Sequence, residues 1–391
     1  MRILLLSAYD ARSHKYWRES LVAEFPKHSW TQLVLPGRYF SWRIRGNSMQ
    51  WALGERAILD QPYDLIIATS MVDLASLKGF VPNLANIQSV LFFHENQFAY
   101  PASLANEKHH LDPKMVTLYA AIAANKLVFN SQYNQQSFIR GVKQLLCQLP
   151  EKMPVDLAQL LDEKSSILPV PLKLLSGFDN EHYPSVNGIT NSKAQQDLTL
   201  WPARYGSKSL RIVWAARWEY DKGPQQLLAI LREMRTRGMD FKLCILGQAF
   251  RQQPPEFESI KTEFSAQLVQ FGYAETRWQY LSWLAGADMM LSTALHEFQG
   301  LAVLEAAQLG CVPVLPERLV YPQMFGLDYV YPSSPDAPAL EAIAAVNLIQ
   351  KLALKRPANI DIMAYVEPLT WPNMRPKYQQ LINSVGHSGP S

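Results

Sequence analysis

Two glutamates eight residues apart mark the stretch of this sequence where chemistry is most expected. Glu297 and Glu305 flank Gly300 within the run 296–305. If a helix begins near Gly300, Glu297 lies in the loop before it and Glu305 lies about one and a half turns inside it. The free N–H groups in the first turn of such a helix suit a phosphate. The stretch therefore offers a carboxylate for sugar hydroxyls, amides for a leaving phosphate and a carboxylate for a ribose, as a nucleotide-sugar transferase requires.

Two cations stand at the end of an apolar run in the same half of the chain. Arg217 follows the predicted strand 210–216, and Lys222 comes five residues later. Because ligands bind at the carboxyl ends of parallel strands, we expect both at the mouth of a cleft. They are suited to neutralise the charge of a departing diphosphate. A solvated charged loop is the alternative for the pair alone, but the nearby glutamates favour the functional interpretation.

Metal ions are not expected in this site. No Asp-any-Asp triplet occurs in the sequence, so the usual sign of a divalent cation on a sugar-nucleotide diphosphate is missing. Arg217, Lys222 and the helix beginning near Gly300 would supply the positive charge instead. We therefore expect no metal and no cofactor, with the nucleotide-sugar as a substrate, and activity that survives EDTA.

Polar residues also follow predicted strands in the first half. His94 ends the run 89–94 and precedes Glu95 and Asn96. A lone histidine is more often structural than catalytic, but its place at a strand end beside polar residues favours a function. Ser13, His14 and Lys15 open the first predicted helix at the same edge. A simple N-cap with an exposed charge is an equal alternative for these three.

The run 25–54 contains no acidic residue, and cations alternate there with aromatic residues. The cations are Lys27, Arg38, Arg43 and Arg45, and the aromatic residues are Trp30, Tyr39, Phe40, Trp42 and Trp51. Cations with aromatic rings suit phosphate contact and stacking on unpaired bases, as in an RNA loop such as a tRNA anticodon loop. A buried core position for the two tryptophans Trp42 and Trp51 and peripheral docking on anionic lipid are the alternatives.

The elements that must position these residues alternate between strand and helix. Predicted strands are 3–7, 30–35, 63–69, 89–94, 126–130, 210–216, 241–246, 269–271, 289–292 and 312–315. Predicted helices are 13–25, 48–60, 112–125, 131–146, 224–237, 256–264, 277–286, 300–310 and 371–384, with Ser13 and Ser131 as N-caps of the first and fourth. This alternation predicts an α/β class with two doubly wound, Rossmann-like domains facing a cleft.

The domain boundaries follow the change of pattern. We assign 1–175 to an acceptor-side domain, 176–209 to a polar linker or insertion, and 210–367 to a donor-side domain. The last segment, 368–391, is predicted to hold a helix that crosses back to the first domain.

Composition limits the class of protein. The 391 residues are 48% apolar and 18% charged, with a net charge of +3, so any nucleic-acid binding needs a local basic patch. Three scattered cysteines argue against disulfides or a zinc site and favour a reducing cytoplasm. No apolar run approaches the roughly 20 residues that span a bilayer. The oligomeric state is not predicted.

Several motifs resemble known families. Arg217 to Lys222 followed by Glu297-x7-Glu305 resembles the donor site of retaining glycosyltransferases with the GT-B fold. More narrowly, the chain resembles the tRNA-queuosine mannosyltransferase family, over nearly its whole length except 176–209. The motifs that carry this likeness are Ser13-His14-Lys15, Phe93-His94-Glu95-Asn96-Gln97, Phe129-Asn130-Ser131, Arg217-Trp218-Glu219, Asp221-Lys222 and His296-Glu297-Phe298.

The resemblance implies a role for each motif. Glu297 would contact the donor sugar, Glu305 the ribose, and Arg217 with Lys222 the diphosphate. The alternative for Glu305 is a helix residue paired with a neighbouring cation. Backbone N–H groups from Gln299 through Gly300 to Leu301 would assist, and His94 would lie beside the sugar.

The resemblance also implies the reaction, which is retaining transfer of mannose from GDP-mannose to queuosine in tRNA. A glycolipid or polysaccharide acceptor, a UDP-sugar donor, and a non-catalytic nucleotide-sugar or RNA-binding module are the alternatives. One departure concerns the loop 8–12, which lacks the paired glycines of many relatives, so side chains of Ser13 and Lys15 would substitute for close amide contact.

Overall fold

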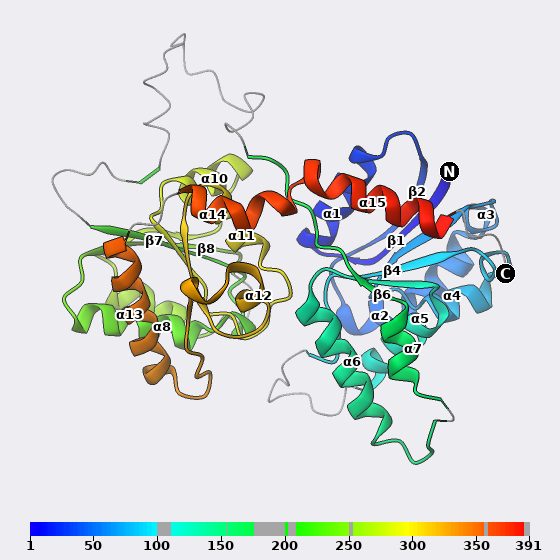
Figure 1. Ribbon diagram of the computed structural model, residues 1–391, viewed down its shortest axis with the longest axis horizontal. Coiled ribbons are helices and arrows are strands. Elements are labelled where there is room, and N and C mark those ends of the chain that lie inside the picture. The colour runs from blue at the N-terminus through cyan, green and yellow to red at the C-terminus, as the bar shows by residue number, and fades with distance from the viewer. Residues whose placement is uncertain are drawn as a thin grey trace, which may run out of the picture. The chain divides into compact units, whose positions relative to one another are not determined.

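Strands and helices alternate along both halves of the chain in the computed structural model (Figure 1). The structure describes residues 1–99, 111–153, 155–175, 200–201, 209–249, 253–355 and 359–386. Its contacts divide the chain into a first unit, Met1–Pro171 with Trp371–Ser391, and a second unit, Leu172–Thr370. Most of the predicted linker, residues 176–199 and 202–208, lies outside the described residues. The predicted α/β class with two parallel sheets is confirmed.

The first unit is built on a six-stranded parallel sheet with the order β2-β1-β3-β4-β5-β6. Its strands are β1 (Arg2–Asp10), β2 (Ser29–Pro36), β3 (Leu65–Thr69), β4 (Ser89–Phe93), β5 (Lys126–Phe129) and β6 (Ser165–Ile167). Every residue of β3 and β4 is buried, because helices cover both faces of the sheet. This burial explains why these strands appear in the sequence as short apolar runs.

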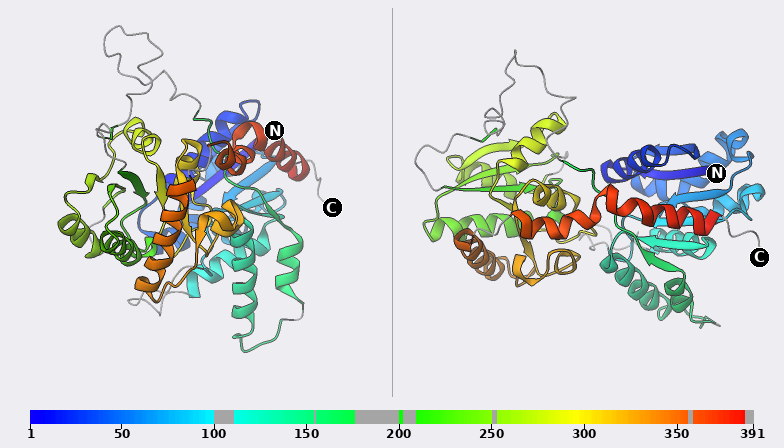
Figure 2. Two further views of the ribbon diagram at one scale, coloured as in Figure 1. Left: turned by 60° about the vertical axis from the view of Figure 1, so that its left-hand side comes forward. Right: turned by 45° about the horizontal axis from the view of Figure 1, so that its top comes forward.

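Helices cover the first sheet on both faces, with α1 and α15 on one and α2, α4, α5 and α6 on the other (Figures 1 and 2). Their bounds are α1 (Arg12–Glu24), α2 (Phe40–Gly54), α3 (Arg56–Leu59), α4 (Leu74–Phe80), η1 (Pro82–Leu84), α5 (Leu111–Ala123), α6 (Gln132–Leu146), α7 (Leu157–Glu163) and α15 (Trp371–Gly386). The C-terminal helix α15 joins this unit through a buried hydrogen bond of 3.0 Å from Trp17 Nε1 to the Tyr378 hydroxyl.

The two predicted N-caps have different outcomes. Ser131 caps α6, since its hydroxyl accepts the N–H of Asn134 at 3.1 Å. The prediction for Ser13 is wrong: α1 begins at Arg12, the N-cap position belongs to Ala11, and no side chain caps it. Ser13 therefore lies exposed inside the first turn.

The second unit repeats this architecture with a parallel sheet in the order β12-β11-β10-β7-β8-β9. Its strands are β7 (Leu210–Ala215), β8 (Phe241–Leu246), β9 (Leu268–Gly272), β10 (Met289–Leu291), β11 (Val312–Pro316) and β12 (Val330–Tyr331). Because β7 and β10 are neighbours, the loops at their carboxyl ends lie side by side. These two loops carry Lys222 and Glu297.

Helices cover the second sheet with α8 and α13 on one face and α10, α11 and α14 on the other (Figures 1 and 2), and α9 packs against α8. Their bounds are η5 (Tyr220–Lys222), α8 (Pro224–Thr236), α9 (Glu256–Glu263), α10 (Arg277–Ala285), α11 (Leu301–Gln308), α12 (Tyr321–Phe325), η6 (Leu327–Tyr329), α13 (Pro338–Lys355), α14 (Asn359–Val366) and η7 (Glu367–Leu369). Among the described residues, no helix is long and apolar enough to cross a membrane.

Candidate functional site

The loop after β10 holds Glu297 by its own backbone. Gly300 takes a left-handed conformation, with φ 68°, and α11 begins immediately after it. This turn aims three successive N–H groups at the Glu297 side chain, whose Oε1 accepts from Phe298 at 3.0 Å, Gln299 at 3.3 Å and Gly300 at 3.0 Å. The amides of Gln299 and Gly300, which we expected to bind phosphate, are therefore occupied by Glu297 in this structure.

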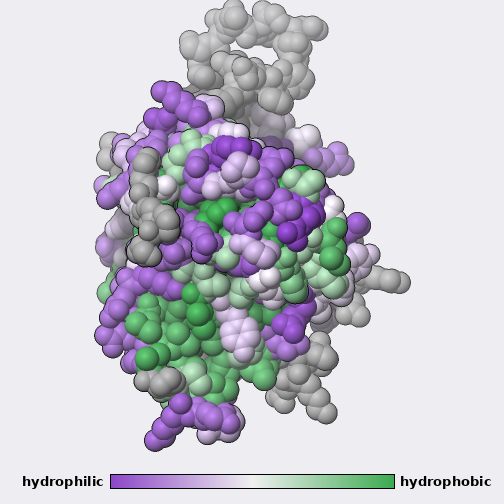
Figure 3. All heavy atoms as spheres, turned by 90° about the vertical axis from the view of Figure 1, so that its right-hand side faces the viewer, coloured by the Kyte–Doolittle hydropathy of each residue, from purple (hydrophilic) through white to green (hydrophobic). Residues whose placement is uncertain are grey.

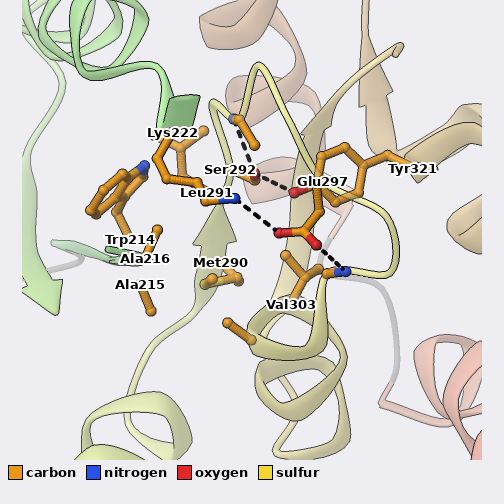
Figure 4. A pocket seen from close by; sticks show the side chains of 13 residues that line it. Trp214, Ala215, Ala216, Lys222, Met290, Leu291, Ser292, Glu297, Val303 and Tyr321 are labelled. Carbon is orange, nitrogen blue, oxygen red and sulfur yellow. Dashed lines mark hydrogen bonds and ion pairs between the residues drawn. The ribbon is translucent and has the colours of Figure 1, made fainter. Parts of the chain in front are cut away.

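Glu297 is a carboxylate throughout the physiological range. Burial by itself would raise its pKa, but the Lys222 ammonium and the three backbone N–H groups outweigh burial and lower the pKa to about 2. Figure 4 shows the two side chains facing each other, with Lys222 Nζ 3.5 Å from Glu297 Oε2. Oε1 is thus fixed by the loop, and the contact of Oε2 among the described residues is the long one to the lysine.

Lys222 is buried among acceptors at the end of η5. Its Nζ donates to the carbonyl of His296 at 2.7 Å and lies 3.2 Å from a carboxylate oxygen of Asp221. Burial acts to lower the pKa of Lys222, but Glu297 and Asp221 reverse this effect and raise the pKa above its ordinary value. The lysine therefore stays a cation. Arg217 is half exposed and pairs with Glu219 at 2.6 Å and Asp221 at 3.8 Å.

Close packing locks the Lys222 loop to the Glu297 loop. Gly223 has φ 67°, and a Cβ added there would lie 2.0 Å from the carbonyl oxygen of Thr293. The Thr293 hydroxyl donates to the Lys222 carbonyl at 2.8 Å, and the Leu295 and His296 N–H groups donate to the Asp221 carbonyl at 2.8 and 3.1 Å. Only glycine fits at 223, so the cation and the carboxylate keep a fixed separation.

A pocket opens beside this pair (Figure 4). Its lining comprises Trp214, Ala215, Ala216, Lys222, Met290, Leu291, Ser292, Ala294, Glu297, Gly300, Ala302, Val303 and Tyr321. The sequence analysis missed Ser292 and Tyr321, whose hydroxyls lie 2.7 Å apart. Ser292 could have been found as the first residue after β10. Tyr321 comes from the distant helix α12 and carries no local signal.

Glu305 lies outside this pocket, on α11. Arg277 of α10 donates two hydrogen bonds to it, at 3.1 Å to Oε2 and 2.5 Å to Oε1. Burial raises the pKa of the neighbouring Tyr280 hydroxyl well above its ordinary value, and Glu305 raises it further. Glu305 is thus paired with a neighbouring cation, as the structural alternative expected, and that cation is Arg277.

His94 and His14 of the first unit form a buried pair. Their ring centroids are 4.3 Å apart, and His94 also lies 4.9 Å from Trp17 and 4.8 Å from Phe92. Burial lowers the pKa of His14 to about 4 despite Asp10, and burial together with His14 lowers the pKa of His94. Both rings are neutral. Their buried nitrogens include His94 Nε2 and both nitrogens of His14, none of which has a hydrogen-bond partner among the described residues.

The other predicted first-unit residues divide into buried and exposed. Asn96 is 1% exposed and donates to the side chains of Asn134 at 2.7 Å and Ser137 at 3.0 Å. Asn96 is therefore part of a buried polar network, in which its amide bonds neighbouring side chains. Lys15 is exposed and lies 3.8 Å from Glu19. Glu95 is partly buried, and its carbonyl accepts from Ser70.

The basic and aromatic run also divides. Trp51 is a core residue at 2% exposure, whereas Trp42 is 53% exposed. Arg43 donates to Gln50 at 2.8 Å, and Arg45 is exposed. The core alternative thus holds for Trp51 and fails for Trp42. No group of three or more His, Cys, Asp and Glu side chains able to hold a metal occurs within the described part of the chain.

Acidification should destabilise the protein through the two neutral histidines. In the unfolded chain His14 takes up a proton near pH 6.5, but in the folded chain only near pH 4. The unfolded state therefore binds more protons within this window, and the free energy of unfolding falls as the pH decreases through it. Urea titrations across the window should show a weaker pH dependence for His14→Phe. An unchanged pH dependence would contradict the lowered pKa.

Two family models match the chain. The one described as tRNA-queuosine alpha-mannosyltransferase N-terminal matches residues 2–172, and the one described as Glycosyl transferases group 1 matches residues 201–344. A tRNA-queuosine alpha-mannosyltransferase of Drosophila melanogaster is 31% identical over 333 residues, which are 85% of this chain and 84% of the relative. A GDP-mannose:cellobiosyl-diphosphopolyprenol alpha-mannosyltransferase of Xanthomonas campestris is 24% identical over 173 residues, 43% of this chain and 45% of the relative.

Solved structures share the two-unit architecture. Sucrose-phosphate synthase from Thermosynechococcus elongatus has a TM-score of 0.69 at 14% identity and covers 98% of both chains. Anabaena HepE in complex with UDP and glucose has a TM-score of 0.61 at 15% identity, over 98% of this chain and 100% of that one. At such low identities the likeness shows the fold alone, which is GT-B.

Proposed function

We propose that this chain, which belongs to the tRNA-queuosine alpha-mannosyltransferase family, transfers mannose from GDP-mannose to queuosine in tRNA with retention of configuration. The chain is a glycosyltransferase, since its second half matches the glycosyltransferase family model and its whole length has the matching fold. Mannose and queuosine are named in the Drosophila relative, and GDP-mannose in the Xanthomonas relative. Donor and acceptor are therefore proposals that rest on kinship.

The fixed pair of Lys222 and Glu297 carries the proposal. As the glycosidic bond breaks, positive charge develops on the sugar and negative charge on the diphosphate. A largely buried cation and a partly buried carboxylate 3.5 Å apart provide one charge of each sign beside a pocket. Charges already oriented need no reorganisation during the reaction, which is the main source of electrostatic catalysis. In this proposal Glu297 contacts the sugar, and Lys222 with Arg217 binds the diphosphate.

Glu305 can hold a ribose while it keeps Arg277. A carboxylate offers about four lone-pair sites, and Arg277 uses two of them. The remaining sites suit the two hydroxyls of a ribose. Arg277 would then orient Glu305 for the nucleoside.

His94 is proposed to hydrogen-bond the donor sugar. Its lowered pKa makes it a neutral imidazole, which can accept from a hydroxyl or donate to one. Its Nε2, which has no hydrogen-bond partner within the described part of the chain, is the atom proposed to form this bond. A neutral ring adds no positive charge, so it does not oppose the charge that develops on the sugar.

Nucleoside analysis tests the proposed acceptor. Purified protein should convert queuosine in tRNA to a product heavier by one hexose when GDP-mannose is supplied, and not when UDP-sugars are supplied. Digestion of the tRNA and mass spectrometry of the nucleosides measure this gain. A hexose gain with UDP-glucose would show that the donor is a UDP-sugar and not GDP-mannose. Absence of any gain with either donor would reject queuosine in tRNA as the acceptor.

A lipid acceptor is the alternative that the same assay separates. Figure 3 shows a face on which hydrophobic side chains gather in the lower part and hydrophilic ones in the upper part. Exposed apolar residues of the first unit include Phe80, Tyr119 and Ile122. Transfer to an extracted polyprenol-linked acceptor, with none to tRNA, would indicate a lipid acceptor at the membrane surface and reject the queuosine proposal.

Activity should not depend on a divalent cation. In the proposed mechanism Lys222 and Arg217 neutralise the diphosphate, so treatment with EDTA should leave turnover within about twofold of the untreated rate. Steady-state transfer before and after chelation measures this, with a magnesium-dependent transferase treated in parallel as the control. Loss of turnover that magnesium or manganese restores would reject metal independence.

A further inference from the structure

An exposed turn and the helix after it form an unusual surface on the first unit. Tyr39 is 70% exposed and Trp42 is 53% exposed, and exposed Arg38 and Arg45 lie beside them in the sequence. We call Arg38, Tyr39, Trp42 and Arg45 the aromatic-basic surface. Aromatic rings of this size normally serve the core, so their exposure requires a reason other than packing.

The backbone of Tyr39 is held in a conformation that a bulky residue rarely adopts. Its φ is 57° and its ψ 54°, in the left-handed region, yet it is not glycine. The loop behind it is fixed, because a Cβ at Gly37 would lie 3.1 Å from the backbone nitrogen of Ala11. The Tyr39 carbonyl accepts from the N–H of Trp42 at 3.0 Å. Backbone strain that leaves a ring in solvent is typical of binding sites.

The Trp42 indole packs directly on the backbone of α2 at Gly46, which has no side chain to separate them. A Cβ at Gly46 would lie 2.7 Å from Cε2 and 2.8 Å from Cζ2 of the indole. The ring therefore rests against the helix backbone at Gly46 and keeps about half of its surface in solvent. An aromatic platform fixed in this way loses little conformational freedom when a flat ligand stacks on it.

The arginines of this surface add positive charge around the two rings. The guanidinium of Arg38 lies 5.5 Å from the centre of the Tyr39 ring. Among the described residues, neither Arg38 nor Arg45 forms an ion pair, and the run 25–54 has no acidic residue. Tyr39 also occupies the N-cap position of α2, where the helix dipole adds partial positive charge.

The surface lies at the functional edge of its sheet. The turn 37–39 follows β2, and His94 follows β4 of the same parallel sheet, so both leave the sheet at its carboxyl edge. Gly37 packs on Ala11, which directly precedes the helix that carries His14. A ligand on the aromatic-basic surface would therefore bind at the edge where the histidine pair lies.

We propose that the aromatic-basic surface binds unpaired nucleotides of an RNA loop, with bases stacked on Tyr39 and Trp42 and phosphates near Arg38 and Arg45. Stacking on aromatic side chains together with cations along the backbone is how single-stranded RNA is held. This inference rests on the proposed tRNA acceptor and extends it from the nucleoside to the loop that carries it.

Direct binding of RNA tests the surface. The probe is a fluorescent RNA stem-loop, compared with a fully paired RNA duplex of equal length. Tyr39→Gly and Trp42→Ala should each raise the Kd for the stem-loop by about tenfold, the usual effect of losing one stacking platform. Gly46→Ala should act like Trp42→Ala, because the added methyl displaces the indole. Arg45→Glu should weaken binding more at low salt than at high salt.

Two controls separate recognition from folding. Tyr39→Gly removes the ring but suits the left-handed backbone, so its Tm should equal or exceed that of the parent. Tyr119→Ala removes another exposed aromatic ring of the first unit and should leave stem-loop binding unchanged. GDP binding should also stay unchanged in every variant.

The outcomes distinguish this inference from the proposed function. Stem-loop binding that survives both Tyr39→Gly and Trp42→Ala would overturn the RNA surface, even if the parent modifies tRNA. If Tyr39→Gly and Trp42→Ala lose binding to anionic phospholipid vesicles but keep stem-loop binding, the surface binds a membrane and the inference is overturned. A parent that modifies no tRNA overturns the proposed function instead.

Discussion

Glu297→Gln should lower mannosyl transfer by a factor on the order of 100 to 1,000, the range found when one oriented electrostatic group is lost from an active site. Glutamine keeps the shape of the side chain but removes its negative charge. Its amide offers one oxygen to the three N–H groups of residues 298–300, and its NH2 faces the Lys222 cation. The sugar then loses the anion that stabilises positive charge in the transition state.

Kinetics and binding together test this role for Glu297. The variant should bind GDP, which lacks the sugar, with nearly the parental Kd, while kcat falls. Glu317→Gln, at an exposed carboxylate after β11, provides the matched control. A kcat of Glu297→Gln within about threefold of the parent would show that the Glu297 carboxylate does not stabilise the transition state. The pKa of Glu297 is lowered from 4.5 to about 2 in the folded protein, so its contribution to stability is lost only as the pH falls through that window. Protonation of Glu297 should therefore cause no fall in the rate near neutral pH.

Lys222→Met should lose both donor binding and stability. The lysine side chain is 11% exposed and lies within 3.5 Å of carboxylate oxygens of both Asp221 and Glu297. Its removal leaves the buried carboxylate of Asp221 and the partly buried one of Glu297 without their shared cation, and loss of the partner of a buried charge typically costs about 3 kcal/mol. The diphosphate also loses a charge-assisted hydrogen bond, worth about 1.5–3 kcal/mol. We therefore expect a markedly lower Tm and a Kd for GDP raised at least about tenfold.

Comparison with Arg217 separates the two effects of Lys222. Arg217 is 51% exposed, so Arg217→Met should weaken GDP binding with little change in Tm. Lys222→Arg should recover part of the stability, because it restores a cation. Calorimetric titration with GDP and thermal unfolding give the two readings. Parental GDP affinity in a folded Lys222→Met variant would exclude the lysine from the diphosphate site.

Much of the fold was accessible from the sequence because its signals are local. The buried runs of β3, β4 and β8 and the start of α8 at Pro224 depend on residues adjacent in the chain. The 18-residue helix α13 was nevertheless missed, and the predicted helix 48–60 is two helices, the end of α2, which begins at Phe40, and the short α3. α2 begins after Tyr39, whose left-handed backbone conformation is rare for a tyrosine. Sequence propensities therefore do not predict a helix start at this residue.

Several first-unit assignments required the structure, because burial decides the role of a polar residue. Asn96 looked suited to a ligand but is sealed among Asn134 and Ser137. Trp42 and Trp51 have the same side chain nine residues apart, yet one is exposed and the other is core. Sequence types alone carry no measure of what covers a side chain.

The sequence by itself determined that two parallel sheets exist and that Lys222 and Glu297 follow strands in the same sheet. Both conclusions follow from periodicity and from the rule that sites lie at the carboxyl ends of parallel strands. Only the tertiary structure decided which atoms meet. It turned the amides before α11 onto Glu297, placed Arg277 on Glu305 from 28 residues away, and brought Tyr321 to Ser292. Such partners are chosen by distances of a few ångströms between separate elements, which no pattern along the chain encodes.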